Sequence, residues 1–222
     1  MPHHEGHSRR KYSPAETALL LIDVQQGFKH PSYWGTEWST PSFQTNITQL
    51  IASFRQAGAP ILHVCNHSIS ETSPLHPSKE GSKLMPYAES VDSEPVLSKT
   101  TNSAFVGTKL EAEIRARGIK RLVVAGLTTA HCVATTVRFA SNLGVVAHRF
   151  GTPDVDDTCN GALVLVSDAT ATTDLVFEGR RFDAETIHAV HLASMKDEFC
   201  DVERTEEVLA TLSAGAKHRP AA

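Results

Sequence analysis

The chain has 222 residues, 41% of them hydrophobic and 21% charged, which is typical of one globular domain with a full-sized core. Its formal net charge is −4 and it has no long run of Lys or Arg, so a nucleic-acid partner is not expected. Apolar stretches are too short to span a bilayer, and the N-terminus lacks the apolar segment of a signal peptide; we therefore expect a cytoplasmic protein that binds no membrane.

The first half of the chain predicts two buried strands and a helix between them. An apolar run over residues 18–24, with Asp23 near its end, predicts a strand buried on both faces. Helical spacing of apolar residues over 47–54, stopped by Gly58, is followed by a second apolar run over 60–65. The polar stretch 66–98 contains four prolines and no clear periodicity, so we expect it to cover a functional site.

The second half continues the alternation. Residues 108–117 predict a helix before Gly118, 121–126 a strand, 131–143 a helix before Gly144, 162–166 a strand and 184–199 a helix. The acidic segment 148–161 lacks the spacing of a calcium loop and is expected to be a surface loop or strand-edge excursion. This order predicts a mostly parallel sheet covered on both faces, with the ligand beyond the carboxyl ends of the strands.

Three residues are candidates for chemistry: Asp23 closes the first predicted strand, Lys99 follows the long polar stretch 66–98, and Cys132 follows the strand predicted over 121–126. Taken singly, they have ordinary readings as a loop cap, a surface charge and a small core residue. Cys132, however, is expected in the first turn of a helix, where the helix dipole stabilises a thiolate. Backbone amides in such a turn form an oxyanion hole, in which each well-placed donor contributes about 3 kcal/mol. The four cysteines are far apart and form no CxxC pair, so we expect neither a zinc ribbon nor a dithiol site.

Three motifs together resemble the isochorismatase-like cysteine hydrolase family. Residues 21–25 read LIDVQ, 98–105 read SKTTNSAF and 126–133 read GLTTAHCV, in the family's order and spacing, and the resemblance covers about residues 13–209. It implies an α/β fold, a Rossmann-like three-layer αβα sandwich with a mostly parallel sheet of about six strands. We expect a single domain over residues 1–222, with its core at about 13–209 and flexible termini.

The resemblance also implies a catalytic triad of Asp23, Lys99 and Cys132. A cis peptide between Leu127 and Thr128 is implied as well, with the backbone amides of Thr128 and Cys132 as the oxyanion hole. Asp23 would accept the thiol proton, and the sulfur would attack an amide, lactam or carbamoyl carbonyl to give a thioester acyl-enzyme. Candidate substrate-binding residues near the motif loops are Phe28, Trp34, His67, His131 and Phe177.

Other readings of the same sequence stay open. Family members that cleave vinyl ethers, as in isochorismate, do not all depend on a cysteine, and a catalytically silent binding protein of this fold is a further alternative. A flavodoxin-like nucleotide site is disfavoured because the loop after the first strand has one glycine, Gly27.

Metal and partner expectations also follow from the resemblance. Nicotinamidases of the family hold a metal through an Asp-x-His pair after the second strand, but residues 63–68 here read HVCNHS, without the acid. A site formed by His63, His67 and His76 is therefore disfavoured, and we expect no metal or cofactor. The expected partner is a small-molecule substrate. Family members form dimers or tetramers, and the apolar helix around Ile187, Val190, Leu192 and Met195 offers a surface for self-association.

Overall fold

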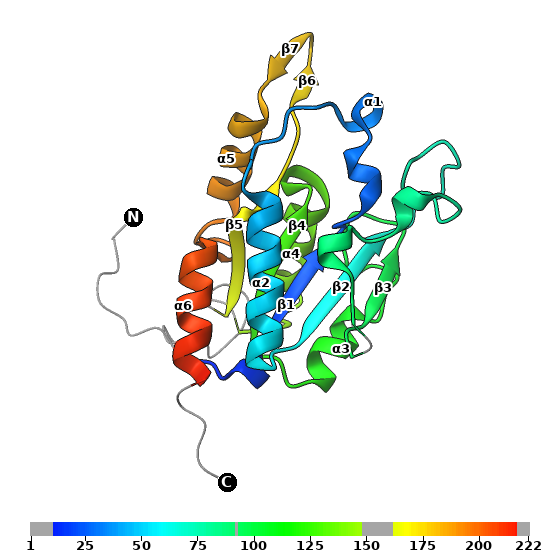
Figure 1. Ribbon diagram of the computed structural model, residues 1–222. Helices are drawn as coiled ribbons and strands as arrows, with labels where there is room; N and C mark the ends of the chain where they lie inside the picture. Colours follow the sequence, from blue (N-terminus) through cyan, green and yellow to red (C-terminus); the bar gives the residue numbers. More distant parts are fainter. Residues whose placement is uncertain (1–10, 92, 148–161, 217–222) are drawn as a thin grey trace.

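A computed structural model describes residues 11–91, 93–147 and 162–216. Residues 1–10 and 217–222 of the termini that we expected to be flexible, and the whole segment 148–161 with Cys159, lie outside the described residues. Within them, a parallel sheet of six strands in the order β3-β2-β1-β4-β5-β8 has helices on both faces (Figure 1). The predicted three-layer α/β fold is confirmed.

The sheet strands are β1 (Thr17–Ile22), β2 (Ile61–Asn66), β3 (Val96–Lys99), β4 (Arg121–Leu127), β5 (Leu163–Ala171) and β8 (Asp201–Glu203). An antiparallel hairpin consists of β6 (Leu175–Phe177) and β7 (Arg180–Phe182). The α-helices are α1 (Pro31–Trp34), α2 (Phe43–Ala57), α3 (Leu110–Ala116), α4 (Ala134–Asn142), α5 (Ala184–Met195) and α6 (Thr205–Ala216). Short 3₁₀ turns span Pro14–Glu16, Gln26–Lys29, Glu80–Ser82 and Pro86–Ala88, and one π-helical turn spans Thr129–Val133.

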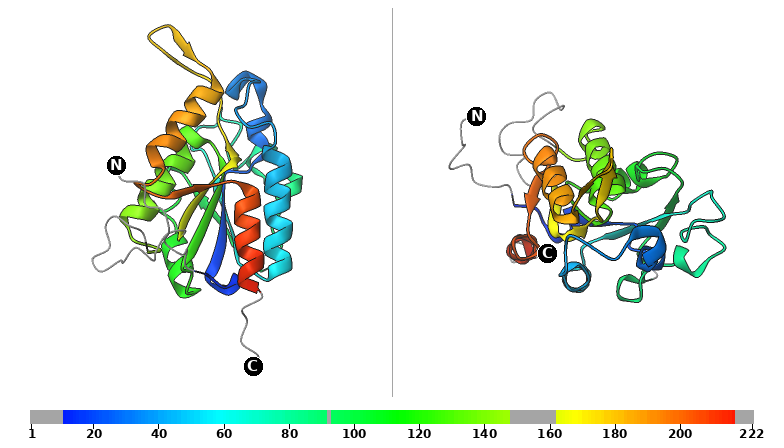
Figure 2. Two further views of the ribbon diagram at one scale, coloured as in Figure 1. Left: turned by 90° about the vertical axis from the view of Figure 1, so that its left-hand side faces the viewer. Right: turned by 90° about the horizontal axis from the view of Figure 1, so that it is seen from above.

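Strand β1 explains why the central part of the sheet is uniformly apolar. Leu20 and Ile22 point into the core shared with α3, α4 and α5, whereas Leu19 and Leu21 point into the core shared with α2 and α6. All six residues of β1 are buried, as expected for a parallel strand covered on both sides. Figure 2 shows the two helix layers enclosing the sheet.

The structure contains four strands and two α-helices, α1 and α6, that the sequence patterns did not predict. Strand β3 lies at the end of the long polar stretch for which no strand was predicted. The other unpredicted strands, β6, β7 and β8, and helix α6 all come after β5 in the chain. Three of these strands have three residues and β3 has four, too few for an alternation to be recognised. Strand β5 also runs on to Ala171, and the helix expected over 184–199 ends at Met195. Among the described residues, no helix is both long and apolar enough for a membrane span.

Gly126 allows β1 and β4 to approach each other closely at their carboxyl ends. Its φ of 129° lies in the region that favours glycine, and a Cβ at this position would overlap the carbonyl oxygen of Ile22. The register between β4 and β5 also shifts between Val124 and Gly126. Because Ile22 directly precedes Asp23, this contact sets where the end of β1 lies relative to the turn after β4.

We predict that Gly126→Ala lowers the free energy of unfolding by about 3 kcal/mol, because the added methyl group must displace the backbone of β1. Gly58→Ala is the matched control: Gly58 also has positive φ, at 65°, but nothing lies within 4 Å of its Cβ position. Its expected cost is therefore only the conformational one, about 1 kcal/mol. Urea unfolding of both variants measures the difference, and equal losses would show that the close approach at Gly126 is unimportant.

Candidate active site

Asp23, Lys99 and Cys132 meet at the carboxyl edge of the sheet. Asp23 is the first residue after β1, Lys99 is the last residue of β3 and Cys132 lies in the π-helical turn after β4. The Lys99 ammonium donates to Asp23 Oδ2 at 2.9 Å and to Cys132 Sγ at 3.2 Å. A third bond, of 3.0 Å, runs from Lys99 Nζ to the carbonyl oxygen of Thr101. The ammonium thus joins two groups that lie far apart in the sequence.

The three side chains are almost completely enclosed: Asp23 is 0%, Lys99 2% and Cys132 8% exposed. Asp23 has a left-handed backbone, with φ at 54°, which is uncommon for a residue other than glycine and is often found at functional sites. Among the described residues, its Oδ1 has no hydrogen-bond partner. One carboxylate oxygen is therefore fixed by Lys99, and the other is left able to accept a proton.

Burial controls the protonation of this group of residues. It raises the pKa of Asp23, an effect that the Lys99 charge opposes but does not cancel. Burial raises the pKa of the Cys132 thiol to about 12, and the Asp23 charge acts in the same direction. For Lys99, burial lowers the pKa, but Asp23 and Cys132 more than offset it, so its pKa lies above the ordinary value. The resting sulfur is therefore a thiol beside an ammonium, and not the dipole-stabilised thiolate that we expected.

The turn that carries Cys132 differs from the predicted helix start at His131. Residues Thr129–Val133 form a π-helical turn, and α4 begins only at Ala134. Such turns are rare and frequently occur at functional sites. The Leu127–Thr128 peptide is cis, as expected from the resemblance. The amides of His131 and Val133 both donate to the carbonyl oxygen of Thr128, and these two hydrogen bonds connect the turn to Thr128.

Helix α5 anchors this turn through His188. The ring Nε2 of His188 lies 3.0 Å from the carbonyl oxygen of Ser167, which can only accept, so Nε2 carries a proton. Burial lowers the pKa of His188, which favours the neutral ring. In that form Nδ1 accepts from the Thr129 hydroxyl, 2.8 Å away. The first residue of the π-helical turn is thereby tied to both α5 and β5.

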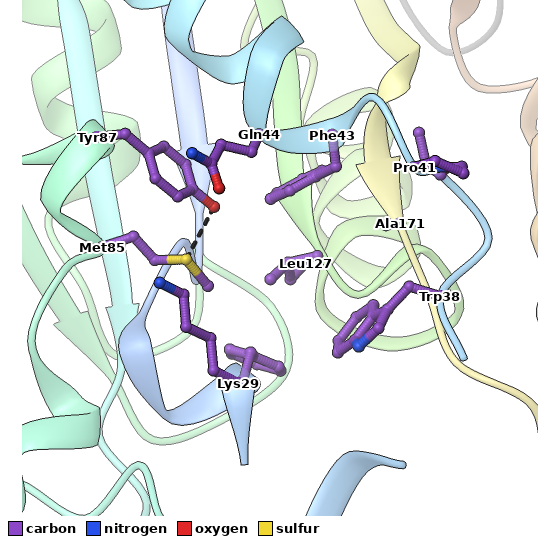
Figure 3. Close-up of a pocket in the computed structure, with 11 residues that line it drawn as sticks. Lys29, Trp38, Pro41, Phe43, Gln44, Met85, Tyr87, Leu127 and Ala171 are labelled. Atoms are coloured by element: carbon purple, nitrogen blue, oxygen red, sulfur yellow. Dashed lines mark hydrogen bonds between the residues drawn. The ribbon is translucent and has the colours of Figure 1, made fainter. Parts of the chain in front are cut away.

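An apolar pocket of about 260 Å³ lies beyond the ends of β4 and β5 (Figure 3). Leu127 and Ala171, the last residues of these strands and partners in register, form part of its wall. Leu127 directly precedes Thr128, the residue before the π-helical turn, so the pocket begins close to that turn in the chain, although Asp23, Lys99 and Cys132 do not line it. The other lining residues are Phe28, Lys29, Trp38, Thr40, Pro41, Phe43, Gln44, Met85 and Tyr87.

Of the five substrate-binding candidates, only Phe28 lines this pocket. Trp34 stacks on Phe28, with 4.6 Å between ring centroids, so it lies next to a pocket residue. The His67 amide donates to the carbonyl oxygen of Lys99, so His67 lies next to Lys99. His131 is exposed and its Nδ1 lies 3.1 Å from Thr128 Oγ1. Phe177 is 69% exposed on the β6–β7 hairpin that projects from the body, so its expected place in a pocket is not supported (Figure 1).

The remaining pocket residues were not identified from the sequence. Lys29 and Trp38 lie in the segment between β1 and α2, where two other residues, Phe28 and Trp34, were already candidates. Met85 and Tyr87 come from the stretch 66–98, which was expected to cover a site but gave no signal for individual residues.

The histidines considered as metal ligands have other contacts. His63 is fully buried, with Nε2 3.0 Å from Glu94 Oε2, and His76 Nδ1 lies 2.8 Å from the Ser78 hydroxyl. In the part of the chain that the structure describes, no group of three or more His, Cys, Asp or Glu side chains is arranged to hold a metal ion. That activity needs no metal stays a prediction.

Comparisons with known proteins identify the family to which this chain is similar. A family model described as the isochorismatase domain matches residues 17–207. The isochorismatase family protein YrdC of Bacillus subtilis is 32% identical over 86% of this chain and 94% of its own length. A maleamate amidohydrolase of Pseudomonas putida is 28% identical, over 61% of this chain and 68% of its own. The crystal structure of an isochorismatase-family protein from Chromobacterium violaceum superposes with a TM-score of 0.81 at 35% identity, covering 94% of this chain and all of that one.

The charges around Cys132 predict opposite effects of two substitutions on thiol alkylation. Asp23→Asn removes a negative charge that raises the Cys132 pKa, so iodoacetamide at pH 8 should modify Cys132 several-fold faster than in the unsubstituted protein. Lys99→Met removes a positive charge that lowers this pKa, so modification should be slower. Mass spectrometry of the Cys132 peptide measures both rates, with buried Cys200 as internal reference and circular dichroism as a check of folding. A slower reaction in Asp23→Asn would contradict the assigned charge effects.

Proposed function

The chain belongs to the isochorismatase family and is a hydrolase of that family, and from this premise we propose that it cleaves a C–N bond in small amides, lactams or carbamoyl compounds. The proposed nucleophile is Cys132 and the intermediate is a thioester. The observation that carries the proposal is the Lys99 ammonium, which donates both to the Asp23 carboxylate and to the Cys132 sulfur. The maleamate amidohydrolase to which the chain is similar supports the same class of reaction.

In the first half of the proposed reaction, Asp23 accepts the proton of the Cys132 thiol while the sulfur attacks the carbonyl carbon. The raised pKa of Asp23 suits it to this step, because a stronger base removes a proton more readily from a thiol with a pKa of about 12. Lys99 stays protonated and stabilises the sulfur as its negative charge develops. The negative oxygen of the tetrahedral intermediate is held by the backbone amides of Thr128 and Cys132.

In the second half, the intermediate collapses and the C–N bond breaks. Asp23 returns its proton to the departing amine or ammonia, which leaves the acyl group bonded to sulfur. A water molecule then gives a proton to Asp23 and attacks the thioester, and the sulfur leaves and recovers that proton. The net reaction consumes one water and yields a carboxylic acid and an amine. The pocket that begins at Leu127 holds the acyl part of the substrate.

A vinyl-ether hydrolase and a binding protein without turnover are the alternatives to this proposal. The enclosed Lys99–Asp23 ion pair argues against a binding protein without turnover. Burying each of these charges costs several kcal/mol, and a site without catalysis gains nothing that offsets this cost. Detection of ammonia or of pyruvate after incubation with small amides, lactams and isochorismate separates the two reactions.

We predict that Cys132→Ala reduces ammonia release at least 10³-fold, because the alanine methyl group cannot form the thioester. The substitution removes one atom from a turn, so the thermal unfolding midpoint should change by only a few degrees. Cys200→Ala, which removes another buried thiol at the opposite end of α5 from the site, is the control and should keep its activity. Turnover that survives in Cys132→Ala would favour the mechanism that does not depend on cysteine.

We also propose that the protein forms a dimer or tetramer. On α5, Val190 is 59% exposed while Ile187 and Leu192 are half-buried and Met195 is buried, so part of the expected surface belongs to the core. Val176 and Phe177 on the hairpin add 66% and 69% exposed apolar side chains. Sedimentation velocity at micromolar concentration should show a species of at least twice the chain mass, and Val190→Glu should shift it towards the monomer. A monomer alone would refute self-association.

A further inference from the structure

We propose that the pocket that begins at Leu127 selects substrates that carry a carboxylate at the end of a short apolar chain, and that Lys29 and Tyr87 recognise this carboxylate. The inference rests on the proposed amide hydrolysis and adds the substrate class. The pocket combines an apolar floor with one cationic wall, and each part restricts what it can bind.

The apolar part is formed by side chains from three separate segments. Leu127 ends β4, Phe43 begins α2, and Phe28 and Trp38 belong to the loop that follows β1. A volume of about 260 Å³ holds roughly nine groups of the size of a water molecule. This suits a chain of a few methylene groups, whose transfer from water onto these side chains is favourable.

The cationic wall contains Lys29. Of the described residues that line the pocket, Lys29 alone is charged, and none is acidic. Its Nζ lies 6.0 Å from the centre of the Tyr87 ring, and no carboxylate among the described residues forms an ion pair with it. Lys29 is exposed, so its ammonium is hydrated when the pocket is empty; a ligand with an anionic end would place an opposite charge beside it, whereas a cationic end would be repelled.

Tyr87 supplies a second donor at the same wall. Its hydroxyl donates to Met85 Sδ at 2.8 Å, and a thioether is a weak acceptor (Figure 3). The pKa of Tyr87 is raised to about 12 by burial, so the hydroxyl keeps its proton. A carboxylate oxygen is a far better acceptor than sulfur and would draw this bond to itself. An ammonium and a phenol hydroxyl beside each other form a recognition site for a carboxylate.

Three primary amides with the same four-methylene chain test the inference. The monoamide of adipic acid ends in a carboxylate, hexanamide in a methyl group and 5-aminopentanamide in an ammonium; the monoamides of succinic and glutaric acid sample shorter chains. The best of the acids should exceed hexanamide in kcat/KM at least tenfold, and the ammonium compound should fall below hexanamide. Equal values for carboxylate and methyl, or a preference for the ammonium, would overturn the inference.

Variants then separate recognition by Lys29 from a general effect on the enzyme. In Lys29→Met the ratio of kcat/KM for the acid to that for hexanamide should fall below threefold, while Lys29→Arg should retain most of it. A merely structural role of Lys29 would lower both values and leave the ratio unchanged. Tyr87→Phe should reduce the ratio by a smaller factor. Lys83→Met is the matched control, because Lys83 pairs with Glu80 outside the pocket and its loss should not alter the ratio.

Binding to Cys132→Ala distinguishes failure of this inference from failure of the proposed reaction. The two tryptophans of the chain are Trp38, in the pocket, and Trp34, stacked on Phe28, so their fluorescence reports occupancy without turnover. If no amide is hydrolysed but adipic acid monoamide binds at least tenfold more tightly than hexanamide, and Lys29→Met removes the difference, the reaction is wrong and the carboxylate site stands. Hydrolysis without any preference for the acid, in rate or in binding, leaves the reaction and overturns the site.

Discussion

The buried ammonium of Lys99 is the constraint on which the rest of this structure depends. Removing a charge from water costs several kcal/mol even after the protein relaxes, so an enclosed lysine requires partners in fixed positions. Here the partners are the Asp23 carboxylate, the Cys132 sulfur and the carbonyl oxygen of Thr101. They reach the ammonium because β3, β1 and β4 are parallel and end at one edge of the sheet.

Apolar packing holds these strand ends in place. The residues of β1 alternate between two hydrophobic cores, so a slip by one residue would exchange the two faces and move Asp23 away from Lys99. The absence of a side chain at Gly126 lets β4 lie against Ile22. Helix α5, through His188 and Thr129, then fixes the turn from the other side. The site is therefore a product of the whole sheet and of both helix layers.

The sequence predicted the parts of this arrangement that follow from strong local patterns. Apolar runs identified β1, β2 and β4, and three motifs singled out Asp23, Lys99 and Cys132, which the structure brings together. That Lys99 ends a strand, β3, was not predicted. Short strands such as β8 and the π-helical turn at Thr129–Val133 depend on neighbours distant in the sequence and leave no periodic trace. The pocket was missed for the same reason, since Lys29 and Tyr87 come from irregular loops whose path only tertiary packing determines.

Enclosure also decides how a cysteine with so high a pKa can serve as a nucleophile. A helix terminus alone would favour a thiolate, which reacts with alkylating agents and oxidants at any time. Burial and the Asp23 charge instead raise the pKa of Cys132 to about 12, so the resting thiol is protected. A sulfur of high pKa is intrinsically the more nucleophilic once its proton is removed. In the proposed reaction that removal occurs when a carbonyl lies beside the sulfur, because Asp23 is already in place as base and Lys99 as counter-charge. The same low-polarity surroundings that suppress the thiolate at rest strengthen its attraction to Lys99 as it forms.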